Sequence, residues 1–243
     1  MSGGAALFDV IRSGGASAGV PDDPRETPDA AFVVSRLRAA AALPPEESAR
    51  ALAVWDEAGA RHDPATIDAV LADLTAGGWV PFVGARGRKS LRLSARAALT
   101  GTRRRGTMEL ALAVLGAIGR KEDAEALETV GRHPAFTLHA ATALSNLDHW
   151  QGRASLLRLL VATNGAERVV VIDRLLPHIR EPAVRLALVR DALTGLAPEH
   201  AREVAPDIAA MLDVKSLAED AKAPADIRAG ARAVLAACPP AAE

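Results

Sequence analysis

Residues 107–147 read "TMELALAVLGAIGRKEDAEALETVGRHPAFTLHAATALSNL", and this stretch decides the fold. It contains three apolar segments, 107–119, 123–131 and 133–147, separated by glycine, charged residues and proline. Segments of this kind with such breaks between them are typical of short helices. In the first segment only Glu109 is charged, so almost no face is left for water. A helix that is apolar all round is covered on several sides by neighbours, which favours an interior helix within a stack.

The same plan of helix and break continues on both sides. Toward the C-terminus the pattern predicts helices over 150–163, 166–179, 181–195, 199–212, 214–222 and 225–238. Toward the N-terminus it predicts helices over 29–43, 45–60 and 63–78, the last capped by Asp63 with Pro64 in its first turn. Glycines stand where helices should stop, at positions that favour a left-handed backbone: Gly101, Gly119, Gly131 and Gly195. Connections of a few residues favour antiparallel neighbours.

The composition supports an all-α fold. Among 243 residues, 49% are hydrophobic and 24% charged, as in ordinary globular proteins, but alanine is abundant, aromatics are 3% and tyrosine is absent. Alanine has the highest helix propensity, whereas strands prefer β-branched and aromatic residues. The single Cys238 excludes an internal disulfide framework and a multi-cysteine metal site.

An internal repeat is visible at an offset of about 29 residues, which places Leu112–Ile118 on Ala141–Leu147. Helical periods of 20 to 50 residues are typical of solenoids, whose units bury their faces against one another. The segment 112–147 resembles a HEAT-type repeat of the short bacterial variety, and "EPAVRLALVRDAL" and "ADIRAGARAVL" echo its Pro, Val-Arg and paired-alanine positions. The resemblance is good over 107–147, fair to residue 237 and poor before residue 90. It implies a right-handed, armadillo-like α-solenoid of antiparallel helix pairs; an irregular helical bundle is the alternative.

These patterns predict three parts. Residues 1–28 are rich in Gly, Ser, Pro and Asp and are expected to form a flexible arm, although its apolar cluster around Leu7 and Ile11 could dock on the body or on a partner. Residues 29–238 are expected to form one helical repeat domain, clearest over 107–238, and residues 239–243 a tail. The N-terminus lacks the features of a signal peptide and no apolar run approaches a membrane span, so a cytoplasmic protein is expected.

The segment "WVPFVGARGRKSLRLSARAALTG", residues 79–101, begins like a short strand and reaches Lys-Ser before a helix. That order suggests a phosphate-binding loop, but Val83 and Arg88 stand where the motif needs glycine. Pro81 weakens the segment as a central strand, and no strand-helix alternation follows. The sequence therefore predicts a connector followed by a helix, and no nucleotide site.

Charge is strongly segregated in this region. No acidic residue lies between Asp73 and Glu109, where the basic residues are Arg86, Arg88, Lys89, Arg92, Arg96, Arg103, Arg104 and Arg105. The remaining 21 basic and 30 acidic residues leave the rest of the chain at −9, although the whole protein has a net charge of −1. Spacing by four places Arg88, Arg92 and Arg96 on one helix face. These eight residues are candidates for binding an acidic protein or a phosphate backbone. The alternative is neutralisation by acidic helices of the same chain, such as "PEESARALAVWDE" or the carboxylates of "KEDAEALE".

No catalytic constellation is present. None of the six histidines has a metal-ligand spacing, and His133 before Pro134 and His149 after Asp148 are expected at helix starts. Helical-repeat DNA glycosylases use groove aromatics with a carboxylate, whereas Trp55, Trp79 and Trp150 form no such cluster and are expected to pack between helices.

The sequence thus predicts a non-catalytic scaffold or adaptor with a protein partner, no cofactor, no metal and no membrane association. A nucleic-acid-binding protein, including a glycosylase-like enzyme, and a self-assembling structural protein are the alternatives.

Overall fold

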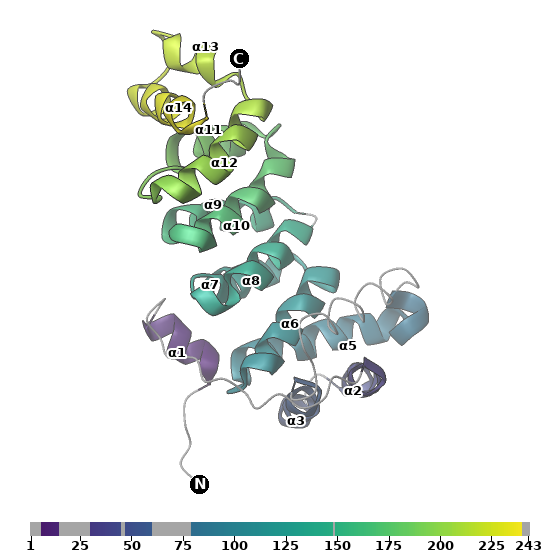
Figure 1. Ribbon diagram of the computed structural model, residues 1–243. Helices are drawn as coiled ribbons and strands as arrows, with labels where there is room; N and C mark the ends of the chain where they lie inside the picture. The colour runs from purple at the N-terminus through teal and green to yellow at the C-terminus, as the bar shows by residue number, and fades with distance from the viewer. Residues whose placement is uncertain (1–5, 15–29, 45–46, 60–78, 148, 240–243) are drawn as a thin grey trace. The chain divides into compact units, whose positions relative to one another are not determined.

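The computed structural model describes residues 6–14, 30–44, 47–59, 79–147 and 149–239 (Figure 1). Within these ranges the regular structure is entirely helical: thirteen α-helices, two short 3-10 helices and no strand. The described chain divides into two compact units, one ending at Gly152 and the other beginning at Arg153. The predicted all-α class is therefore confirmed, whereas a solenoid and the single domain over 29–238 stay predictions.

The first unit is helical throughout its described residues, and short connections join α5, α6, α7 and α8. Its elements are α1 (Leu7–Gly14), α2 (Ala30–Ala42), α3 (Ser48–Gly59), α5 (Trp79–Gly101), α6 (Arg105–Ile118), the 3-10 helix η2 (Lys121–Asp123), α7 (Ala124–Gly131) and α8 (Pro134–Asn146). Helix α9 (Trp150–Ala162) begins at its end. Helix α2 packs on α3 and α5, and α7 packs on α8.

Helix α6 lies at the centre of this unit, as its sequence predicts. It contacts α3, α5 and α8, and Met108, Leu112 and Leu115 are fully buried. Gly116 lets α6 approach α8, because a Cβ at this position would lie 3.0 Å from the Ala143 Cα. Small residues therefore set the separation of the two helices that the internal repeat aligns.

The apolar cluster near the N-terminus docks on the body. Helix α1 packs against α5 and α7, with Leu7 and Ile11 buried, and the Leu7 amide donates to the Thr102 carbonyl at 2.7 Å. The sequence allowed this segment to be part of a flexible arm or to dock, and residues 7–14 are docked on the body of the protein.

Helix α5 corrects the expectation that the segment from residue 79 begins as a connector before the helix. It begins at Trp79, although Gly84 has a non-helical conformation with φ 71° that divides the helix. Pro81 lies within its first turn, where the missing amide would have no helical partner. The helical path through Lys89 and Ser90 also removes the loop that a phosphate-binding motif needs.

The second unit contains α10 (Gly165–Leu175), η3 (Leu176–His178), α11 (Pro182–Asp191), α12 (Pro198–Met211), α13 (Val214–Glu219) and α14 (Ala225–Ala237). Helix α14 packs against α11, α12 and α13. Gly230 permits this packing, because a Cβ there would collide with the Val189 carbonyl of α11. The predicted helices from residue 107 onward all occur, with ends within a few residues; the predicted helix 63–78 and its Asp63 cap lie outside the described residues.

A buried arginine ties the loops of the second unit together. Arg168 is 7% exposed; its Nε donates to the Thr163 carbonyl at 2.8 Å, and Nη1 donates to the Thr194 carbonyl. Burial lowers the pKa of this guanidinium, and the negative charge of Asp191 partly offsets that effect. The side chain thus satisfies carbonyls that the ends of two helical segments leave without backbone partners.

The glycine predictions are partly wrong. Gly101 and Gly131 are the last residues of their helices and Gly119 caps a third, but only Gly195 of the four has positive φ, at 72°. Gly119 is extended at φ −63° and ψ 170°. The glycine therefore marked the helix end at three of the four positions, whereas α11 ends at Asp191, four residues before Gly195, and the conformation at most of these ends was not predictable.

Candidate anion-binding surface

The basic segment of residues 86–105 is divided by the structure into exposed and internally paired side chains. Near the start of the regular part of α5, Arg86, Arg88 and Lys89 are all exposed. No carboxylate in the described part of the chain pairs with them. Three solvated cations close together in sequence, with no counter-ion among the described residues, are available to an external anion.

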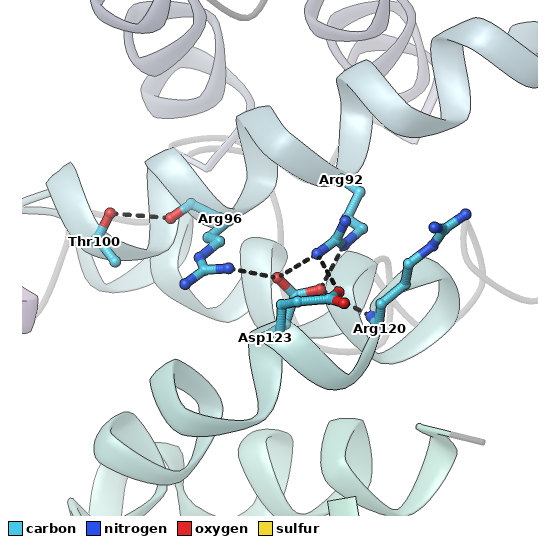
Figure 2. A network of polar contacts seen from close by, with 6 residues as sticks. Arg92, Arg96, Thr100, Arg120 and Asp123 are labelled. Carbon is cyan, nitrogen blue, oxygen red and sulfur yellow. Dashed lines mark hydrogen bonds and ion pairs between the residues drawn. The ribbon is translucent and has the colours of Figure 1, made fainter. Parts of the chain in front are cut away.

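Arg92 behaves differently, because it is turned toward carboxylates of the η2 segment (Figure 2). Its side chain is 11% exposed; Nε donates to Asp123 Oδ2 at 2.6 Å, and Nη2 donates to Glu122 Oε2 at 3.0 Å. Such charge-assisted contacts are stronger than neutral hydrogen bonds. Arg92 therefore links α5 to the turn between α6 and α7.

Asp123 is the centre of this link. Its side chain is fully buried and also accepts the Arg120 amide at 2.8 Å, while Arg96 Nη1 lies 3.6 Å from Oδ1 (Figure 2). A buried carboxylate is stable only when paired and hydrogen bonded, and here two arginines and a backbone amide supply those contacts. Arg92 and Arg96 thus pair with acidic residues of the same chain, in the "KEDAEALE" segment. This is the internal neutralisation that was expected from the sequence as the alternative to an external anion.

The remaining three arginines lie at the corner between α5 and α6. Arg105 Nε donates to Glu109 Oε1 at 2.8 Å, one turn further along α6. Arg103 and Arg104 are exposed, and no described carboxylate pairs with their side chains. At a rise of 1.5 Å per residue, this corner lies about 20 Å along the helix from Arg88. The eight predicted residues thus lie in two regions of the first unit, and three of them (Arg92, Arg96 and Arg105) pair with carboxylates of the same chain.

The corner itself is fixed by a small polar network. Thr102 Oγ1 and Thr107 Oγ1 donate to Asp56 Oδ1 of α3 at 2.7 and 2.9 Å. In the same region Trp55 is buried and its Nε1 donates to Ser94 Oγ of α5 at 3.2 Å. These contacts hold α3 against α5 and α6, so the exposed cations project from an ordered framework.

Two exposed cations next to the contact between Arg92 and Asp123 were missed in the sequence. Arg120 and Lys121 begin the η2 segment immediately before the paired Glu122 and Asp123. Residues 120–123, "RKED", have no net charge, so their two basic residues do not stand out in the sequence. Burial of Asp123 separates the two halves, because one carboxylate turns inward while both cations remain exposed.

A cavity in the second unit was also missed. It has a volume of about 570 Å³ and lies between α11, the end of α12 and α13. Its lining is mainly apolar and includes Leu186 and Met211, which are about half exposed. Arg185 and Asp213 contribute charged groups to the lining. The apolar residues come from three helices, so no single periodic pattern marks them.

In the described chain no group of three or more His, Cys, Asp or Glu side chains is arranged to hold a metal ion. His133 caps α8 as predicted, its Nδ1 accepting the Ala135 amide at 3.2 Å. The packing prediction for tryptophan is confirmed for the buried Trp55 and wrong for Trp150, which is 53% exposed.

Comparison of the chain with protein-family models, with curated protein sequences and with solved structures found no match. Among the described residues, no helix has both the length and the apolar character required to cross a membrane.

Proposed function

We propose that this protein is a non-catalytic helical adaptor that binds an acidic partner protein through exposed cations of α5. The observation that carries the proposal is the group Arg86, Arg88 and Lys89, which is exposed and has no described carboxylate partner. Arginine forks match carboxylates geometrically, and clustered charge accelerates encounter with an oppositely charged surface.

The scaffold in this proposal is a HEAT-like, right-handed solenoid. Its support is the helical repeat around α6 and α8, the close approach at Gly116, and the short connections that favour antiparallel pairs. Repeat arrays of this kind present extended surfaces to partners and do not require a catalytic group.

The direct test measures binding of a short fluorescein-labelled polyglutamate peptide to the full chain by fluorescence anisotropy at ~50 mM salt. The variant R86E R88E K89E reverses only exposed cations. Arg92 and Arg96 are left intact, because reversing them would leave Asp123 without its partners. Binding is expected to fall by more than tenfold, since each exposed ion pair contributes up to about 1 kcal/mol and reversal adds repulsion.

The matched control is R180E R202E, which reverses two exposed arginines of the second unit and should change peptide affinity less than threefold. Circular dichroism must show the same helicity for both variants and the wild type. Unchanged peptide binding by R86E R88E K89E would refute the proposal. Stronger binding of a single-stranded oligonucleotide of equal charge would favour the nucleic-acid alternative.

A further inference from the structure

A second pair of cations adjoins the α5 group through the buried carboxylate. Arg92 Nε and the Arg120 amide both donate to Asp123 Oδ2, at 2.6 and 2.8 Å. One oxygen atom therefore joins the side chain of Arg92 to the backbone of residue 120. Figure 2 shows the Arg120 side chain extending away from Asp123. The start of η2 is thus held beside the α5 face that carries Arg88 one turn before Arg92.

The combined surface has a marked excess of positive charge. Its six cations are Arg88, Lys89, Arg92, Arg96, Arg120 and Lys121, and its two carboxylates are Glu122 and Asp123. The formal excess is +4. Asp123 is fully buried and engaged by arginine, so Glu122 is the carboxylate of the pair that faces solvent. Four of the cations are exposed and belong to two chain segments about thirty residues apart.

We propose that Arg120 and Lys121 act with Arg88 and Lys89 as one binding site for an acidic peptide segment of a partner protein. This inference rests on the function proposed above and extends its site onto η2. Glu122 acts as an internal competitor in this site, because its carboxylate, 49% exposed, already occupies Arg92 Nη2 at 3.0 Å. A carboxylate of the partner can replace it without disturbing the buried contact with Asp123.

The local chemistry favours a peptide over a nucleic acid. Glu122 of this surface and Glu125, which follows it in the chain outside the surface, are exposed and would repel a continuous phosphate backbone. No aromatic residue lies within 85–101 or 119–125, so the surface offers no platform on which bases could stack. Separate carboxylates along a flexible peptide can instead be placed on the individual cations.

The experiment uses the full chain and the same labelled polyglutamate peptide, with three variants. R120E K121E is expected to weaken binding about tenfold, similarly to R88E K89E. E122Q is expected to tighten binding about twofold to threefold, because it removes both the competition for Arg92 and one negative charge. The control R180E R202E should leave affinity within threefold of the wild type. Urea unfolding of each variant checks that the fold is retained.

The outcomes separate this inference from the function on which it rests. If R88E K89E weakens binding but R120E K121E does not, the extension onto η2 is wrong and the proposed function stands. If neither variant weakens binding, both are wrong. Weaker binding by E122Q at unchanged stability would overturn the role of Glu122 as competitor. A single-stranded oligonucleotide of equal charge that binds more tightly than the peptide would overturn the assignment of the ligand.

Discussion

Replacement of Asp123 by alanine tests whether the ion pair with Arg92 holds α5 to η2. The Asp123 side chain is fully buried and that of Arg92 is 11% exposed. Removing one partner of a buried ion pair costs about 3–5 kcal/mol, because the other charge stays buried without compensation. Arg92 retains Glu122 at 3.0 Å, which lowers this cost, whereas the Arg120 amide loses its acceptor, which adds about 1 kcal/mol. The expected loss in free energy of unfolding is about 3 kcal/mol.

The measurement is urea unfolding, with Trp55 as the reporter of the first unit. Trp55 is buried and bonded to Ser94 of α5, so its fluorescence follows the packing of α3 on α5. Replacing Trp79 and Trp150 by phenylalanine leaves it as the single emitter. The matched control in that background is E122A, which removes the half-exposed carboxylate and should cost less than about 1 kcal/mol.

A double-mutant cycle with R92A completes the test. If the two side chains stabilise the fold through each other, the double variant should be less destabilised than the sum of the single variants by about 1–3 kcal/mol. A loss below about 1 kcal/mol in D123A, or additive effects of D123A and R92A, would refute the assignment of this contact as the link between α5 and η2.

Three further predictions concern the second unit. Gly230→Ala should lower its free energy of unfolding by about 2 kcal/mol in urea, because the new methyl group meets the Val189 carbonyl; no loss would show that α11 and α14 separate freely. Partial desolvation, together with Asp207 and Glu203, raises the pKa of Asp173, so wild-type stability falls as pH rises through the folded-state pKa. Asp173→Asn should therefore stabilise the protein at pH 7, with a difference that vanishes below about pH 4; a melting temperature equal to wild type at pH 7 would contradict this. Burial and Arg153 lower the pKa of His178. The contribution of the neutral imidazole to the stability of the fold is therefore full above about pH 6.5, and it is lost as pH falls through the folded-state pKa. His178→Gln should flatten that acid-side loss of thermal stability, and parallel melting curves across this range would argue against it.

Helix positions were largely predictable because local signals agreed with one another. Pro134 after His133 marked the start of α8, and the charge-free run around Leu112 marked a helix covered by neighbours. Both signals come from residues that are close together in the chain. The connector predicted from residue 79 was wrong because a short apolar run does not distinguish an extended segment from a helix. Helix α5 begins at Trp79 and reaches Gly101, with a break at Gly84.

The candidate site was less predictable, because charge alone does not reveal which side chains face one another. The spacing of Arg88, Arg92 and Arg96 gave the shared face correctly, but it could not show that Asp123, some thirty residues further on, takes up two of the three. Lys121 was overlooked for the same reason, since its acidic neighbour turns inward only after folding. Ion pairs between distant segments form only when the helices of the unit pack together, so they cannot be read from local sequence.

The docked α1 has a consequence for the order in which the chain folds. Many helix contacts in the described chain join elements near one another in sequence, but the Leu7 amide donates to the Thr102 carbonyl, 95 residues further along. Synthesis proceeds from the N-terminus, and a contact between distant residues forms only after the intervening loop has closed. Helix α1 must therefore emerge from the ribosome long before its docking surface exists, and Leu7 and Ile11 stay uncovered until α5 and α7 have been made. Attachment of this helix is expected to be a late step of folding that closes the first unit.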